Sequence, residues 1–133
     1  MELKPYQKQV ISDLWEYLKL SEKDYIEWYN QFWSEKWFSI NPMDPRSLPP
    51  YQDTIPWCPH VCLKVPTAWG KTFIACNALK TIFEYYPKIK EKVVVWLVPS
   101  NTILNQTIKN LSNPDHPYNQ KIRSLFNGRF EIS

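Results

Sequence analysis

Glycine is scarce in this sequence of 133 residues, which contains only Gly70 and Gly128. Gly-rich low-complexity segments are thereby excluded, and the place of each glycine is informative because glycine adopts backbone conformations that other residues avoid. The three cysteines leave one over in any disulfide pairing, which argues against a disulfide framework and favours a reducing compartment. No apolar run approaches the roughly 20 residues of a membrane span, and the N-terminus lacks the apolar core of a signal peptide. We therefore expect a soluble, cytoplasmic protein with no membrane partner.

Aromatic residues, in contrast, are abundant: they make up 16% of the chain and include seven tryptophans. Together with a hydrophobic fraction of 44%, this composition excludes intrinsic disorder and supports one domain with a substantial core. The charge is uneven, because residues 1–60 carry six basic and nine acidic side chains, whereas residues 61–133 carry ten and four. The basic half favours a polyanionic partner, and an ordinary solvated surface is the alternative.

The first part of the chain predicts two helices. Residues 5–20 place apolar side chains at helical spacing, and Pro5 suits the first position of a helix. Ser21 and Asp24 resemble a capping box for a second helix. The aromatic stripe that follows, over residues 25–38, is more typical of a packed face than of a surface that stacks bases.

A proline-rich segment separates these helices from the rest of the chain. Six of the twelve prolines fall within residues 41–59, a density that forbids a regular helix or a central strand. We therefore expect a helical N-terminal extension at 1–40, a connector at 41–59 and an incomplete P-loop domain at 60–133.

Beyond residue 60 the pattern alternates between strands and helices. Val61–Val65 and Val93–Val98 are short apolar runs typical of buried strands, and a helix is predicted after each of them, over 72–85 and 102–111. The order strand, helix, strand, helix favours an α/β fold with parallel strands. The tail adds a predicted short helix at 117–126, a turn at Asn127-Gly128 and the start of a third strand at 129–132.

The most informative segment joins the first predicted strand to its helix and reads Val65-Pro66-Thr67-Ala68-Trp69-Gly70-Lys71-Thr72. A loop at the start of a helix points backbone N–H groups and the positive end of the helix dipole at one spot, which makes an anion site. Gly70 permits close approach to a phosphate, Lys71 adds charge for the outer phosphates, and the Thr72 hydroxyl completes a Mg²⁺ shell. A plain helix start with a surface lysine is the alternative, which the position after a predicted strand disfavours.

At these residues the sequence resembles a known family. Residues 66–72 resemble motif I of superfamily-two helicases, with Val65 in place of the usual first Gly or Ala and Ala68 in place of the usual fourth-position Gly. Leu97–Gln106 is similar to motif Ia, and Leu3–Gln7 resembles the adenine-recognition motif that contains a glutamine. The phrases that most resemble the restriction (Res) subunit of type III restriction enzymes are Val61–Thr67, Trp96–Ile103 and Asn113–Tyr118. The resemblance spans most of the chain and implies a partial RecA-like P-loop domain with parallel strands.

The resemblance implies a nucleotide site for ATP and Mg²⁺. Gln7 would recognise adenine, because a side-chain amide offers a donor and an acceptor together; an ordinary exposed helix residue is the alternative. Lys71 and Thr72 would be catalytic, Thr72 through the Mg²⁺ ion. Trp69 would either lie over the base or pack under the loop. The residues implied to bind the nucleotide are Gln7, Thr67, Ala68, Trp69, Gly70, Lys71 and Thr72.

The resemblance also implies a nucleic-acid contact at the start of the helix predicted over 102–111. Ser100 and Asn101 would contact a phosphate through hydroxyl, amide and backbone N–H groups, and Gln106 would support that loop. Many relatives carry an arginine at the Asn101 position, so this contact is expected to depend less on salt here. A helix N-cap is the other interpretation of Ser100 and Asn101, and both can hold together.

The resemblance implies ATP-dependent translocation on double-stranded DNA. The enzyme would be a restriction-modification endonuclease, in which this chain has a modification or specificity subunit as its partner. A motor of this kind needs an acidic pair, usually Asp-Glu, to hold Mg²⁺ and orient the attacking water. The chain contains no adjacent Asp-Glu pair, so we expect an N-terminal fragment that binds ATP without useful hydrolysis. The alternatives are a P-loop enzyme of another class, such as a small-molecule kinase, and a non-catalytic adaptor. The kinase does not explain the similarity over Pro99–Gln106.

Cys58, His60 and Cys62 invite comparison with a zinc site. Their spacing is not the paired Cys-x₂-Cys of structural zinc sites, and the sequence offers no clear fourth ligand. Cys62 also falls within a predicted strand, where a thiol behaves as a small hydrophobic group. A zinc site is therefore not expected.

Overall fold

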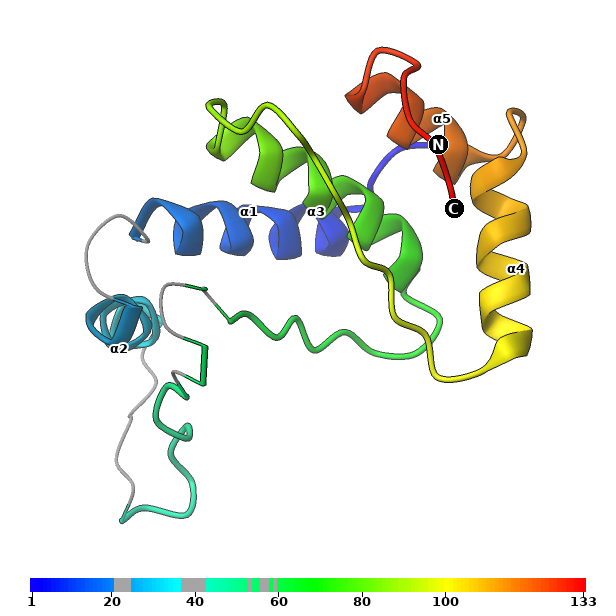
Figure 1. Ribbon diagram of the computed structural model, residues 1–133. Coiled ribbons are helices and arrows are strands. Elements are labelled where there is room, and N and C mark those ends of the chain that lie inside the picture. The colour runs from blue at the N-terminus through cyan, green and yellow to red at the C-terminus, as the bar shows by residue number, and fades with distance from the viewer. Residues whose placement is uncertain (21–24, 37–42, 53, 56–57, 59) are drawn as a thin grey trace. The chain divides into compact units, whose positions relative to one another are not determined.

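The structure is a computed structural model, and it describes residues 1–20, 25–36, 43–52, 54–55, 58 and 60–133. These residues form five helices: α1 (Pro5–Leu20), α2 (Tyr25–Glu35), α3 (Lys71–Tyr85), α4 (Asn101–Ser112) and α5 (Pro117–Leu125) (Figure 1). The chain divides into two compact units, of which unit 1 comprises Met1–Ile11 and Pro66–Ser133 and unit 2 comprises Ser12–Val65. The first residues of α1 thus belong to unit 1 and the remainder to unit 2.

The helices begin where the local sequence favours a start. Pro5 opens α1 and Pro117 opens α5, two positions where the missing proline N–H would have no helical partner in any case. The predicted helices at 5–20, 72–85, 102–111 and 117–126 are confirmed to within one residue at each end, and the predicted second helix is confirmed as α2. Its expected cap, Ser21 and Asp24, lies outside the described residues. None of the described helices is long and apolar enough to cross a membrane.

The predicted strands are wrong, and so is the expected α/β RecA-like fold with parallel strands. Residues 60–133 are described throughout, and they contain no strand. A strand is stable only when its N–H and C=O groups pair with a neighbouring strand. Among the residues that the structure describes, no backbone hydrogen bond connects Val61–Val65 or Val93–Val98 to another segment. Residues 129–132, expected to begin a third strand, are irregular as well.

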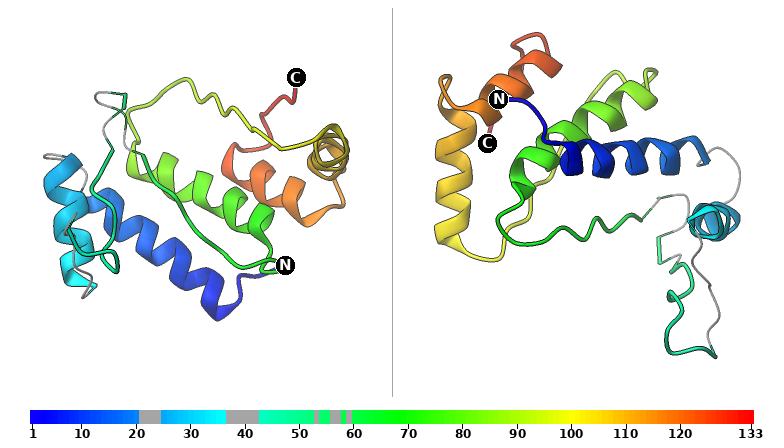
Figure 2. Two further views of the ribbon diagram at one scale, coloured as in Figure 1. Left: turned by 90° about the horizontal axis from the view of Figure 1, so that it is seen from below. Right: turned by 180° about the vertical axis from the view of Figure 1, so that it is seen from behind.

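The second predicted strand, Val93–Val98, is exposed, although its apolar composition predicts a buried segment. The side chains of Val93, Val95 and Leu97 are 84%, 78% and 88% exposed. In Figures 1 and 2 this stretch, which follows α3, runs as an extended trace without an arrow. Continuous β-branched sequence predicts a strand covered on both faces, whereas here one side of the segment has no cover.

Unit 1 is built around α5, which packs against both α3 and α4 (Figure 2). Its buried apolar side chains are Phe73, Ile74, Cys76, Ala78, Leu111 and Ile122. Asn119 of α5 is buried with them, and its amide nitrogen donates a hydrogen bond to the carbonyl of Leu111 near the end of α4. This bond satisfies a carbonyl in the last turn of α4, where the helix itself supplies no donor.

Unit 2 has a small core of its own, in which α1 and α2 meet. Tyr17 and Phe32 are both buried and pack edge to face, with ring centroids 5.6 Å apart. The Lys36 ammonium group, just after α2, forms ion pairs with two acidic residues: its Nζ atom lies 3.1 Å from Asp13 Oδ1 and 2.9 Å from Glu16 Oε2. The buried Phe32 agrees with the prediction that the aromatic stripe packs.

Other members of the aromatic stripe are less deeply placed. Tyr29 and Trp33 are half-buried, and the Tyr29 hydroxyl donates a hydrogen bond of 2.7 Å to the carbonyl of Pro49. The side chains of Tyr25 and Trp28 lie outside the described residues. Partial burial raises the pKa of the Tyr29 hydroxyl.

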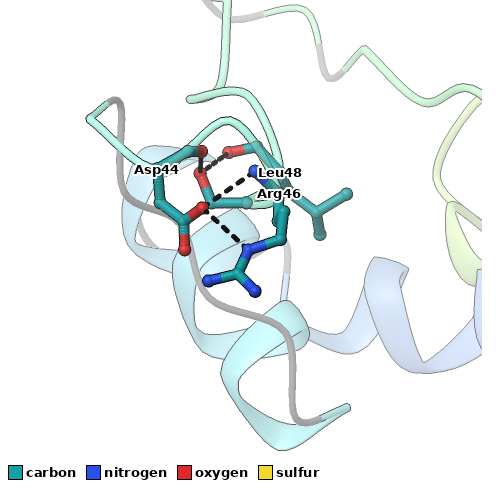
Figure 3. A network of polar contacts seen from close by, with 4 residues as sticks. Asp44, Arg46 and Leu48 are labelled. Carbon is teal, nitrogen blue, oxygen red and sulfur yellow. Dashed lines mark hydrogen bonds and ion pairs between the residues drawn. The ribbon is translucent and has the colours of Figure 1, made fainter.

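The proline-rich connector forms turns and irregular chain wherever it is described. Figure 3 shows one such turn, around Asp44, Arg46 and Leu48. The Asp44 carbonyl accepts hydrogen bonds from the Ser47 N–H at 3.0 Å and from the Ser47 hydroxyl at 2.8 Å. The Asp44 carboxylate accepts from the Arg46 N–H at 2.9 Å, which is a common way for Asp to stabilise a turn. The expected division at 1–40, 41–59 and 60–133 stays a prediction.

Candidate functional site

The predicted phosphate loop leads directly into α3. Gly70 is the N-cap residue and has φ 70° and ψ 46°, a left-handed conformation that glycine adopts without steric cost. Ala68, two residues earlier, also has a positive φ of 65°, which is uncommon for a residue with a side chain. The backbone before α3 is therefore not extended, because it contains two left-handed residues, Ala68 and Gly70.

The start of α3 offers free donors to an anion. The first N–H groups of a helix have no acceptor within it, and Gly70 supplies no side-chain cap. Lys71 is exposed and Thr72 is half-buried, both in the first turn of α3. A phosphate placed here would meet N–H donors, the positive end of the helix dipole and an ammonium group.

Gln7 lies against this loop, although 62 residues separate it from Trp69. Its side chain is only 3% exposed. Its amide nitrogen donates a hydrogen bond of 2.9 Å to the Trp69 carbonyl, and its amide oxygen accepts one of 2.9 Å from the Lys4 N–H. Figure 2 shows the start of α1 beside the chain that enters α3. The structure thus brings Gln7 together with the predicted phosphate loop.

The contact with Lys4 explains how Gln7 is held. Gln7 is the third residue of α1, and its oxygen accepts the N–H of the residue that precedes the helix, as the Gln or Glu of a capping box does. Sequence reasoning missed this role. The pattern Pro5 followed by Gln7 was a usable signal, because proline marks the first helical position and glutamine then occupies the third.

An aromatic pair lies at the same place. The ring centroids of Tyr6 and Trp69 are 4.2 Å apart, with the planes inclined by 45°. Trp69 keeps 38% of its surface exposed. Tyr6 was not among the predicted site residues, and its position beside Gln7 in the sequence was the only available signal.

The predicted nucleic-acid residues are placed on α4. Ser100 is the N-cap, and its hydroxyl accepts a hydrogen bond of 3.4 Å from the Ile103 N–H. Asn101 is the first residue of α4, and both it and Gln106 are exposed. No hydrogen bond joins these three residues to Gln7 or to Thr67–Thr72, all of which are described. The structure therefore brings the predicted residues together as two groups, one on each helix start.

A groove of about 740 Å³ lies elsewhere in unit 1. Its lining mixes apolar side chains, such as Trp96, Leu104 and Phe126, with charged ones, such as Lys92 and Arg129, whereas none of the loop residues Thr67–Thr72 contributes to it. The candidate nucleotide site is consequently a surface loop at a helix start and not this groove.

The residues considered for zinc do not form a cluster. Cys58 and Cys62 are exposed, and the His60 ring faces the Thr54 hydroxyl with 3.3 Å between Nδ1 and Oγ1. Within the part of the chain that the structure describes, no group of three His, Cys, Asp or Glu side chains converges as metal ligands do.

Comparison with known proteins identifies a family. No curated protein and no solved structure matches the chain. A family model described as type III restriction enzyme, res subunit, matches residues 1–133. This match covers the entire sequence, including the loop at Thr67–Thr72 and the start of α4, and it confirms the resemblance seen in the motifs. The chain belongs to the family of type III restriction enzyme res subunits, which are helicase-like proteins of superfamily two.

Proposed function

We propose that this chain binds ATP together with Mg²⁺ at the loop Thr67–Thr72, as part of the motor of a type III restriction enzyme. The observation that carries the proposal is the left-handed Gly70 at the N-cap of α3, directly before Lys71 and Thr72. It leaves the first N–H groups of the helix uncapped by any side chain, next to an exposed ammonium group. Family membership supports the same conclusion, because members of this family generally use ATP and Mg²⁺.

The residues present fit a triphosphate by the chemistry of their donors. Backbone N–H groups and Lys71 are donors only, which suits phosphate oxygens. The Thr72 hydroxyl is an oxygen ligand of the kind that Mg²⁺ accepts while it retains most of its waters. When bound, Mg²⁺ would neutralise charge on the outer phosphates. This support comes from the loop and from the start of α3. The strand predicted before the loop, which had disfavoured a plain helix start with a surface lysine, is absent from residues 60–133 and adds no support.

The wider function follows from the family and remains part of the proposal. We infer translocation on double-stranded DNA in a complex with a modification subunit, because res subunits typically act on DNA with such a partner. Ser100, Asn101 and Gln106 at α4 are the proposed contacts to the DNA backbone. The Ser100 hydroxyl already accepts a hydrogen bond at the helix start, and Asn101 and Gln106 are exposed and accessible to a phosphate.

Nucleotide titration tests the proposed site. We expect the wild-type chain to bind ATP in the presence of Mg²⁺, and Lys71→Ala to weaken binding at least tenfold, since the variant removes the only charged side chain of the loop. Isothermal titration calorimetry measures both affinities. Lys80→Ala is the matched control, because Lys80 is an exposed lysine of the same helix that pairs with Glu84 at 3.7 Å and lies outside the loop.

Each outcome separates the proposal from its rivals. Equal affinities for wild-type and Lys71→Ala chains, or no binding at all, would contradict the nucleotide site and favour a non-catalytic adaptor. We also expect no appreciable ATP hydrolysis by this chain, because it contains no adjacent Asp-Glu pair to orient the attacking water. Turnover that depends on Lys71 would refute that expectation. A small-molecule kinase would bind ATP in the same way, but double-stranded DNA would not stimulate the full-length enzyme.

A further inference from the structure

The position of Gln7 is difficult to reconcile with adenine recognition by its side chain. To read a base edge, an amide must present its donor and its acceptor to the ligand. In this structure the oxygen of Gln7 accepts the Lys4 N–H and the nitrogen donates to the Trp69 carbonyl, both at 2.9 Å. The side chain is also 3% exposed, so a base has no open route to either end of the amide.

The same contacts make Gln7 well placed to orient the phosphate loop. The bond from Gln7 fixes the carbonyl of Trp69, and that carbonyl shares a planar trans peptide with the N–H of Gly70. In a trans peptide the C=O and N–H point in opposite directions. Holding the Trp69 carbonyl toward Gln7 therefore aims the Gly70 N–H away from Gln7.

Gly70 and Gln7 also fit together sterically. A Cβ atom built on Gly70 would lie 2.8 Å from Nε2 of Gln7, closer than two such atoms approach in real structures. The left-handed φ of 70° independently favours glycine. Any other residue at position 70 would therefore push against the side chain that holds the preceding carbonyl.

We propose that Gln7 is a positioning residue, which holds the Trp69–Gly70 peptide in the orientation that binds phosphate and so supports binding of the triphosphate whatever the base. This inference rests on the proposed nucleotide site, and it assigns Gln7 a role through the loop in place of contact with adenine. Because the contact acts on the backbone, it serves ATP, GTP and inorganic tripolyphosphate alike.

The choice of ligand distinguishes the two roles. Gln7→Met keeps the length of the side chain and loses both hydrogen bonds, and Gln9→Met, at an exposed glutamine of the same helix, is the control. We expect Gln7→Met to weaken the binding of ATP, GTP and tripolyphosphate by the same factor, about three- to tenfold for the lost hydrogen bond to the Trp69 carbonyl of the loop. The ratio of ATP to GTP affinity should stay unchanged. Isothermal titration calorimetry measures all three. Selective loss of ATP affinity would overturn the inference and restore adenine recognition, and unchanged affinities would overturn it as well.

A second measurement needs no nucleotide. Because the Cβ of Gly70→Ala meets the Gln7 side chain, the free energy of unfolding lost by Gly70→Ala should be smaller in a Gln7→Ala background than in the wild type. Gly128→Ala is the matched control, since Gly128 has a similar φ of 76° but its added Cβ would meet only Arg123 Cγ, at 3.9 Å. The free energy of unfolding lost by Gly128→Ala should be the same in the wild type and in the Gln7→Ala background. If the losses of unfolding free energy from Gly70→Ala and Gln7→Ala were strictly additive, the two side chains would not be in contact, and the positioning role would be overturned. This result does not depend on nucleotide binding, so it is distinguishable from a failure of the proposed function.

Discussion

Two residues that are far apart in the sequence shape the candidate site together. Gln7 lies near the start of α1 and Gly70 just before α3, and the fold brings the amide of one against the backbone of the other. The glycine was identifiable from the sequence because glycine is so rare in it. The buried state of Gln7 was not, because an exposed and a buried glutamine look the same in a helical pattern.

Cys76 gives a prediction at the same scale. Its thiol has no exposed surface, and desolvation raises its pKa from 9.0 to about 11, against smaller opposing effects of a backbone hydrogen bond and of Lys121. As the pH rises, the thiol of the unfolded chain ionises first, near pH 9, while the folded thiol retains its proton to about pH 11. The free energy of unfolding should therefore fall over this interval, by about 2–3 kcal/mol.

Urea denaturation at pH 7, 9 and 10.5 measures this effect. Cys76→Ala removes the group that titrates, so its stability should fall less over the same interval, although its stability at pH 7 is lower because a buried side chain is truncated. If the free energy of unfolding fell with pH equally in the wild type and in Cys76→Ala, the prediction would be wrong, and the thiol would be accessible to water in the folded state.

At the scale of elements, local signals placed the helices well. Proline at Pro5 and Pro117 and the hydroxyl of Ser100 mark three of the helix starts, and each acts on backbone groups within a few residues of itself. The strand predictions failed because strand pairing depends on residues far away in the chain. The apolar, β-branched composition of Val93–Val98 indicates that the segment favours an extended strand conformation. It does not indicate whether a neighbouring strand is present to pair with it.

Asn119 shows how two helices are joined at this scale. Its amide nitrogen donates to the Leu111 carbonyl, and its oxygen accepts a hydrogen bond of 3.2 Å from Nε of Arg123. We expect Asn119→Leu to lower the free energy of unfolding by about 1–3 kcal/mol, since it leaves a buried carbonyl without a donor. Chemical denaturation measures the loss.

The neighbouring residue provides the control. Gln120 is exposed on α5, so Gln120→Leu should change stability by no more than about 0.5 kcal/mol. If Asn119→Leu were equally mild, the contact between α5 and the end of α4 would not contribute to the stability of unit 1.

At the scale of the whole molecule, the described residues form two compact units and no strand. Amide hydrogen exchange tests this arrangement directly. The amides of α3 should exchange slowly because they are hydrogen-bonded within a helix that carries buried residues. Those of Val93–Val98 should exchange rapidly, because no backbone hydrogen bond from the described part of the chain holds them. Slow exchange at Val93–Val98 would contradict the structure and indicate that this segment is paired as a strand.

The sequence by itself determined the helices and the position of the loop before Lys71, because helix hydrogen bonds, caps and the conformational freedom of glycine act over a few residues. It also determined the family, because the motifs around the loop and at the start of α4 are contiguous. Only the tertiary structure decided that Val61–Val65 and Val93–Val98 find no partner strand among the described residues, and that Gln7 is buried against the Trp69 carbonyl. Both depend on which distant segments meet, and that is set by packing across the whole chain.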